Sequence, residues 1–105
     1  MFNYQIIIEY DGKNFIGWQK QKNGISVQST IEKNLSKILK TRIIIYGSGR
    51  TDSGVHAQGQ SAHFNINYKI NNELLFLNSV NFFLRKKKIS ILKINEKKID
   101  FHARF

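Results

Sequence analysis

An arginine and an aspartate lie two residues apart in the stretch YGSGRTDSGVHAQGQ, which spans residues 46–60. A guanidinium this close to Asp52 favours the ionised form of the carboxylate, which is the form that acts as a nucleophile. Gly49 and Gly54 flank the pair and let a bulky ligand approach the backbone. An aspartate in a turn more often only accepts backbone N–H bonds. Here Arg50 and the two glycines favour a catalytic carboxylate instead.

Three other kinds of site fit this stretch poorly. A phosphate-binding P-loop ends in Gly-Lys-Ser or Gly-Lys-Thr before a helix, whereas Arg50-Thr51 stands here and a strand is expected to follow. The serines lack the G-x-S-x-G pattern of a hydrolase nucleophile. The histidines at positions 56, 63 and 102 lack metal-ligand spacing, and the chain has no cysteine. The sequence therefore predicts neither a metal site nor a bound nucleotide cofactor.

Composition restricts the class of partner. The 105 residues suffice for one domain, and 17 lysine and arginine residues against 7 acidic ones give a formal net charge of +10. So large a charge favours a polyanion, because phosphate contacts release counterions, although abundant lysine can also be compositional drift. The sequence contains no membrane-span pattern and no secretory signal. We expect a cytoplasmic protein that binds nucleic acid.

The strands and helices on either side of Asp52 must position its carboxylate. The hydrophobic patterns along the chain predict a mixture of strands and helices. Runs of β-branched residues predict strands, and apolar stripes at helical spacing predict helices. The expected strands are 4–10, 42–47, 60–67 and 89–95, and the expected helices are 26–40 and 71–84. This β-α-β-β-α-β order is that of a ferredoxin-like α+β domain, with both helices on one face of an antiparallel sheet. The other face is left for a partner.

The expected core joins the two helices to the sheet. Ser26 is the expected N-cap of the first helix, and Asn71 or Asn72 that of the second. The residues expected to be buried are Val27, Ile31, Leu35, Leu74 and Leu77 of the helices and Ile6, Ile8, Phe64 and Ile91 of the strands. Further apolar side chains, beyond what one helix layer needs, are Ile7, Ile44, Tyr46 and Leu92. They predict an apolar open sheet face and a chain that self-associates.

Four segments resemble one known family. GRTDSGVHAQGQ resembles the signature of the TruA family of tRNA pseudouridine synthases, and IEYDGKNFIGWQKQ (8–21) resembles that family's opening motif. SVQ (26–28) resembles the start of the family's first helix, and FHARF (101–105) resembles a segment that precedes a tyrosine-containing motif. The segments occur in the family's order and cover nearly the whole chain, so the resemblance is far more specific than a single RTD match.

The resemblance implies an isomerase that converts uridine to pseudouridine in the anticodon stem-loop of tRNA, without metal or cofactor. Such an enzyme detaches uracil from ribose, rotates it and rejoins it through carbon, and the base must leave its stack to be reached. In the family's motif Asp52 is the nucleophile or acid–base group, and Arg50 pairs with it and helps to hold the flipped nucleotide. Thr51 and His56 belong to the same motif, where shaping the backbone around the RNA is their expected role.

Other side chains near this motif are candidates for contacts with RNA. Lys13, Lys20 and Lys22 decorate the loop that leads toward the motif and are expected to contact phosphates. Trp18, with Phe15, either stacks on RNA or anchors the core, and a lone tryptophan after a strand is more often an anchor.

The resemblance also implies a protein longer than 105 residues. Family members are more than twice this length, and their active site lies between two similar halves. The expected partners are therefore tRNA and either a missing C-terminal half or a second copy of the chain, as in a homodimer. Residues 1–105 are then a single N-terminal domain, expected to be inactive alone.

Two alternative functions stay open. One is a non-catalytic basic RNA-binding module of ferredoxin-like fold, and the other is a stranded half-domain with no activity. An RNA-recognition module would have an aromatic-rich third strand, but QSAHFNIN (60–67) supplies only Phe64 of that pattern. The sequence therefore favours the enzyme.

Overall fold

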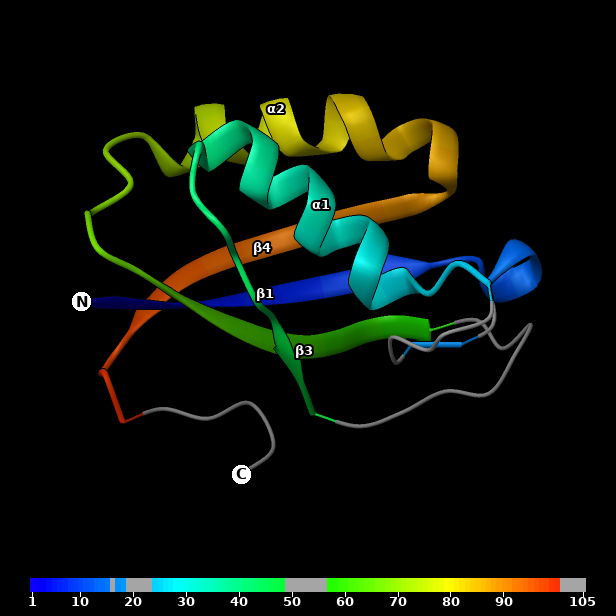
Figure 1. Ribbon diagram of the computed structural model, residues 1–105, viewed down its shortest axis with the longest axis horizontal. Helices are drawn as coiled ribbons and strands as arrows, with labels where there is room; N and C mark the ends of the chain where they lie inside the picture. The colour runs from blue at the N-terminus through cyan, green and yellow to red at the C-terminus, as the bar shows by residue number, and fades with distance from the viewer. Residues whose placement is uncertain (16, 19–23, 49–56, 101–105) are drawn as a thin grey trace.

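Within the residues that the computed structural model describes, which are 1–15, 17–18, 24–48 and 57–100, four antiparallel strands form one sheet. The elements are β1 (Phe2–Tyr10), η1 (Gly12–Asn14), α1 (Val27–Leu39), β2 (Tyr46–Gly47), β3 (Ala57–Ile66), α2 (Glu73–Leu84), η2 (Arg85–Lys87) and β4 (Ile89–Lys97). The strand order is β2-β3-β1-β4, and α1 and α2 lie on the same face of the sheet (Figure 1). The prediction of a ferredoxin-like α+β fold is confirmed.

The core lies between the sheet and the two helices. Alternate residues of β1 and β3 point toward the helices, and every fourth residue of α1 points back. Among the least exposed side chains are Tyr4, Ile6, Ile8 and Phe64 of the strands and Val27, Ile31, Leu35 and Val80 of the helices. Each buried side chain of this size stabilises the fold by about 1.5–3 kcal/mol. The burial predicted for α1 and for the strands is therefore confirmed.

The buried face of α2 differs from the prediction. Asn72, one of the two predicted N-caps, precedes the helix, and its side chain accepts the Leu75 N–H. Leu74, expected in the core, is 68% exposed, and Leu77 is only partly buried. The helix instead buries Phe76, Val80 and Leu84. Its sequence, ELLFLNSVNFFL, is apolar on nearly every side, so its periodicity does not select one face.

The second strand is shorter than predicted. The run 42–47 was expected to be a strand, but only Tyr46–Gly47 pairs with β3. The preceding backbone is instead bonded by three polar side chains that recur one turn apart on α1, here called the α1 polar ladder. Gln28 Nε2 donates to the Ile45 carbonyl (2.9 Å), Glu32 Oε2 accepts the Ile45 N–H (3.0 Å), and Ser36 Oγ accepts the Ile43 N–H (2.8 Å). These side chains satisfy backbone groups that would otherwise need a neighbouring strand.

The sheet face away from the helices, here called the open face, is more polar than expected. Residues that pair directly across neighbouring strands share a face. By this register the open face carries, besides Ile7 and Tyr46, the residues Asn3, Gln5, Glu9, Ser61, His63, Asn65, Ser90, Lys93, Asn95 and Lys97, and Leu92, at the bulge of β4, is also exposed. Amide, hydroxyl and lysine groups therefore predominate over the apolar side chains that the sequence emphasised. Neither α1 nor α2, the two α-helices among the described residues, has the length and hydropathy to cross a bilayer.

Candidate active site

Most residues expected to do chemistry lie outside the described residues. This holds for Arg50, Thr51, Asp52 and His56 of the motif and for Lys20 and Lys22. The structure does describe both ends of the segment 49–56 that carries the motif. Gly47 pairs with Ala62 in the β2–β3 register, and the Ser48 N–H donates to the Ser61 carbonyl at 2.9 Å. The segment therefore starts from the paired end of β2 and rejoins the sheet at β3.

Lys13 is the one predicted phosphate-binding lysine among the described residues. It lies in η1, directly after β1, and its side chain is exposed. The Asp11 carboxylate caps this short turn by accepting the Lys13 N–H at 3.0 Å. An exposed ammonium on a fixed turn is available to a phosphate, so the structure leaves this prediction open.

Gly47 and Trp18 make the closest packing beside the segment. A Cβ placed on Gly47 would lie 2.5 Å from Trp18 Nε1 and 2.7 Å from Trp18 Cε2, which no real side chain tolerates. Glycine is therefore required here because the indole covers the backbone of β2. Trp18 is 3% exposed, so its ring belongs to the core. Of the two roles considered for Trp18 and Phe15, packing is confirmed, since Phe15 is buried as well.

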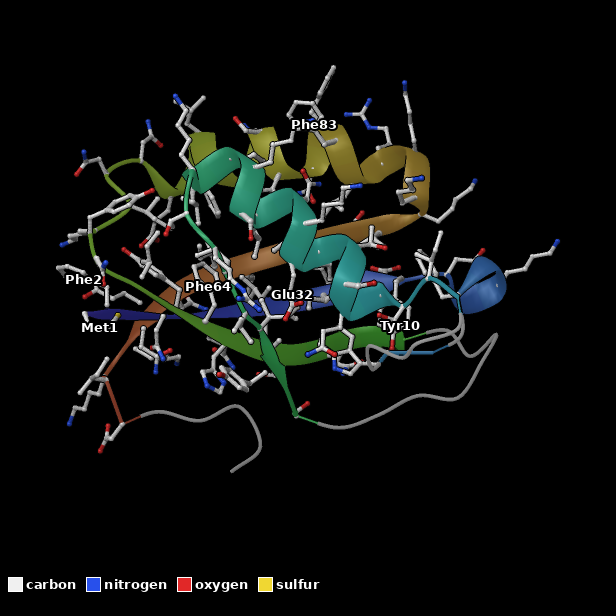
Figure 2. All side chains as sticks on the ribbon, viewed as in Figure 1. Met1, Phe2, Tyr10, Glu32, Phe64 and Phe83 are labelled. Carbon is white, nitrogen blue, oxygen red and sulfur yellow. The ribbon has the colours of Figure 1, made fainter. Side chains whose placement is uncertain are left out.

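Tyr10 fixes the indole from the other side. The two rings stack with centroids 6.2 Å apart, and the Tyr10 hydroxyl donates to Gln60 Oε1 at 2.8 Å. Tyr10 is the last residue of β1, at the end that leads into η1 (Figure 2). The chain of contacts Gly47–Trp18–Tyr10–Gln60 thus ties β1, β2 and β3 together at the end of the sheet where the segment 49–56 begins and ends.

The start of α1 is bonded into the same region. Its first N–H groups, which have no partner within a helix, donate to neighbouring carbonyls: Val27 N to Gly17 O (3.1 Å) and Gln28 N to Trp18 O (2.9 Å). Ser26 caps the helix by accepting the Ser29 N–H. The Gln28 side chain then bonds the Ile45 carbonyl, one residue before β2. Gln28 therefore links the segment around Trp18 to the strand that leads toward Asp52.

The sequence did not identify the α1 polar ladder as a supporting feature. Glu32 is 6% exposed and points from α1 toward the sheet (Figure 2). A buried carboxylate at this position needs a partner, which the Ile45 N–H supplies. The available signal was the spacing of Gln28, Glu32 and Ser36, since three polar residues at i, i+4 and i+8 form a second stripe beside the apolar one.

Among the described residues, neither shifted pKa values nor clusters of metal ligands identify further candidate site residues. Burial raises the pKa of the Tyr4 hydroxyl above its ordinary value, although the Ile70 N–H that it accepts at 2.8 Å acts in the opposite direction. Tyr4 lies in the core between the sheet and helices, so this shift concerns stability. In the part of the chain that the structure describes, no three histidine, aspartate or glutamate side chains gather as metal ligands would.

Comparison with known proteins identifies relatives of the whole chain. A family model described as tRNA pseudouridine synthase matches residues 6–105. The chain is 51% identical over 104 residues to the tRNA pseudouridine synthase A of Pelagibacter ubique (strain HTCC1062). This match covers 99% of the chain and 42% of the relative. It is 46% identical over 103 residues to the protein of the same name from Ehrlichia ruminantium (strain Gardel), covering 97% and 42%. For Rhizobium meliloti (strain 1021) the identity is 42% over 110 residues, covering 100% and 43%.

These matches also define how much of the relatives the chain represents. It spans about two fifths of the length of the curated relatives that it matches. The matched part includes the segment 49–56 and every described element from Ile6 onward.

Proposed function

The chain belongs to the tRNA pseudouridine synthase family, and on this premise we propose that it contributes the catalytic carboxylate of a TruA-like isomerase. The substrate is uridine in the anticodon stem-loop of tRNA, and the product is pseudouridine. One observation carries the proposal. The motif segments around Trp18, Gln28 and Gly47, far apart in sequence, contact one another at the base of the segment that contains Asp52.

The proposed reaction conserves atoms and electrons. The N1–C1′ bond of uridine breaks, the detached uracil rotates, and a C5–C1′ bond forms. C5 loses a proton and N1 gains one, so no oxidant or reductant is needed. Asp52 acts as the nucleophile or acid–base group, and Arg50 keeps it ionised while contacting the flipped nucleotide. Thr51 and His56 shape the backbone around that nucleotide.

The geometry supports a positioning role for the sheet. A reacting group must be held close to its productive position, and sites built on strands and helices are held better than sites on free loops. Here the residues just before the segment 49–56 are fixed by β2–β3 pairing, by the indole of Trp18 and by Gln28 of the α1 polar ladder, and Ala57, just after it, pairs with Tyr10 of β1. Lys13, Lys20 and Lys22 would then bind phosphates of the same tRNA.

The proposal also includes partners and location. The tRNA anticodon arm is the substrate partner, and the enzyme acts in the cytoplasm, without metal or cofactor. The remaining walls of the site come from polypeptide beyond these 105 residues or from a second copy of the chain, as in a homodimer. The greater length of the relatives supports a contribution from further polypeptide.

The test uses an enzyme in which residues 1–105 replace the matching part of the Pelagibacter ubique relative. Tritium release from tRNA labelled at uridine C5 reports turnover, and a gel shift reports binding. Asp52→Asn should abolish tritium release and leave tRNA affinity within about twofold, since the amide is isosteric but a poor nucleophile. Arg50→Ala should weaken both. Lys33→Ala, at an exposed position of α1, is the control and should change neither.

Two results would contradict the proposal. Full turnover by Asp52→Asn would remove the carboxylate from the mechanism. An unsubstituted chimera that binds tRNA without turnover would favour the alternative, a non-catalytic RNA-binding module of ferredoxin-like fold. The isolated 105 residues should show no turnover, and turnover by them would contradict the need for further walls.

A further inference from the structure

One row of side chains crosses the open face through all four strands. Tyr46 of β2 pairs with His63 of β3, His63 pairs with Gln5 of β1, and Gln5 pairs with Asn95 of β4. Neighbouring strands are about 4.8 Å apart, so the row is about 14 Å long. It therefore places one aromatic ring, one buried imidazole and two amides side by side on one face of the sheet.

Tyr46 and His63 form a stacked pair at one end of this row. Their ring centroids are 5.1 Å apart with an interplanar angle of 23°. The two rings differ greatly in exposure, since Tyr46 is 44% exposed and His63 is 4% exposed. His63 thus supports the tyrosine ring from the side of the sheet, and the tyrosine presents its surface to solvent. A fixed, exposed aromatic ring is the usual stacking partner for an unpaired base.

The pair lies close to the start of the segment 49–56. Tyr46 belongs to the strand that enters this segment, and His63 belongs to the strand that leaves it. The Ser48 N–H donates to the Ser61 carbonyl, which fixes the entry beside β3. A nucleotide stacked on Tyr46 would therefore lie beside the residues at which the segment 49–56 begins.

The rest of the open face is suited to a nucleic acid strand. Gln5 Nε2 donates to Ser61 Oγ at 2.9 Å, so an amide and a hydroxyl group of this face are held by a hydrogen bond to each other. Lys93 pairs with Ile7 and Lys97 with Asn3, which places two cations of β4 on this face. Among the described strand residues of the open face, Glu9 is the only acidic one. Together with the net charge of +10, this composition is complementary to a phosphate backbone.

We propose that Tyr46, supported by His63, is a stacking platform for an unpaired base of single-stranded RNA, adjacent to the nucleotide that Asp52 acts on. Lys93 and Lys97 contact phosphates of the same strand. The inference rests on the proposed function and extends it by a second nucleotide subsite, outside the motif. An apolar protein partner is the competing occupant, but the amides and lysines of this face suit such a partner poorly.

The test measures binding of an eight-residue oligouridylate to the 105-residue chain by fluorescence anisotropy at several salt concentrations. Tyr46→Ala should raise Kd about 5- to 160-fold, the range expected for one base–aromatic stack. The dependence of log Kd on log salt should keep its slope, because stacking releases no counterions. Tyr46→Phe should bind within about twofold of the unsubstituted chain, since the ring is retained.

Two control variants separate stacking from charge and from general damage. Phe83→Ala removes an aromatic ring of similar exposure, 54%, from the side of α2 that faces away from the sheet (Figure 2), and should leave Kd unchanged. Lys93→Gln should lower the salt slope by about 0.7, the value for one phosphate of a single strand. An abasic oligomer should bind the Tyr46→Ala variant and the unsubstituted chain equally.

The proposal is overturned if Tyr46→Ala leaves Kd unchanged, or if Tyr46→Phe loses as much affinity as Tyr46→Ala. It is also overturned if sedimentation shows chain–chain association that Tyr46→Ala abolishes, because the ring would then belong to a protein interface. Asp52→Asn in the chimera reports on catalysis alone. If Asp52→Asn kept full turnover, the proposed function would be rejected while the oligouridylate result stayed the same. The two failures are therefore distinguishable.

Discussion

At the scale of single residues, Gly47 has much less room for a side chain than Gly59. The Trp18 indole occupies the space where any Cβ would lie. That indole is held by Tyr10 and is almost fully buried, so it has little freedom to move away. The same contact lies two residues before the segment 49–56. A side chain at position 47 therefore acts on stability and on the placement of the catalytic segment together.

We predict that Gly47→Ala lowers the free energy of unfolding by about 1–3 kcal/mol, the usual cost of overpacking a filled core. Urea denaturation of the 105-residue chain measures this as a lower midpoint with an unchanged slope. In a Trp18→Leu background the same substitution should cost clearly less, because the obstructing ring is absent. Equal costs in the two backgrounds would show that Trp18 is not the obstacle.

Some of the residues in the site could be found from sequence, and others could not. Asp52 and Arg50 were identified because their types and flanking glycines form a local pattern. Tyr46 and His63 lie 17 positions apart and meet only through the β2–β3 register. No local pattern reports such a pair, because the pairing register is a property of two strands. Trp18 was judged correctly as a core anchor, since a lone aromatic residue after a strand usually packs.

At the scale of elements, α1 does more than cover the sheet. Its apolar stripe fills the core, while its polar ladder bonds the backbone of the residues that precede β2. The helix thus serves as a substitute neighbour for a strand that lacks one. This explains why only the last two residues of a β-branched run predicted as a six-residue strand pair in the sheet.

We predict that Glu32→Leu lowers the free energy of unfolding by about 1–3 kcal/mol, because it leaves the buried Ile45 N–H without its acceptor. Glu32→Gln should lower it by less, since an amide oxygen still accepts this bond. Hydrogen exchange at Ile45 should accelerate in Glu32→Leu and stay slow in Glu32→Gln. Lys33→Leu, one position away and exposed, should stay within about 0.5 kcal/mol. Equal losses for the two Glu32 variants would contradict a role for the acceptor.

For α2, hydrophobic periodicity did not predict which face of the helix is buried. Strands and α1 alternate clearly between apolar and polar positions, so their buried faces were predicted correctly. In α2 apolar side chains lie on several sides of the helix, and the buried set Phe76, Val80 and Leu84 was decided by packing against β4 and α1. The exposed side chains that remain are Leu74, Leu75, Phe82 and Phe83. Exposed apolar surface therefore lies on this helix as well as at Ile44, Tyr46 and Leu92.

At the scale of the whole molecule, charge dominates the behaviour expected with RNA. The net charge of +10 is carried by a body whose Cα radius of gyration is 12.8 Å. So dense a positive charge attracts polyanions over distances of about one Debye length, roughly 10 Å at 0.1 M salt. Fold class and charge could both be predicted from sequence, because each is a sum over many residues and tolerates local errors.

We predict that the 105-residue chain binds tRNA weakly, with an affinity that falls steeply as salt rises. Each phosphate neutralised adds about 0.9 to the slope of log K against log salt for duplex regions. Filter binding between 25 and about 300 mM potassium chloride measures this slope. An affinity that does not change with salt concentration, or no binding at the lowest salt, would mean that the excess of lysine has no part in RNA recognition.

The central position of β1 also has a consequence for the order of events during synthesis. The ribosome completes this strand first, at Tyr10, but its two neighbours end at Ile66 and Lys97. At about 5–20 residues per second, the second neighbour follows roughly 4–17 seconds later. Until Ile66 is made the run Ile6-Ile7-Ile8 has no strand on either side, and until Lys97 is made it has at most one. An apolar strand that waits this long for its partners is open to aggregation, which is the hazard that chaperones counter.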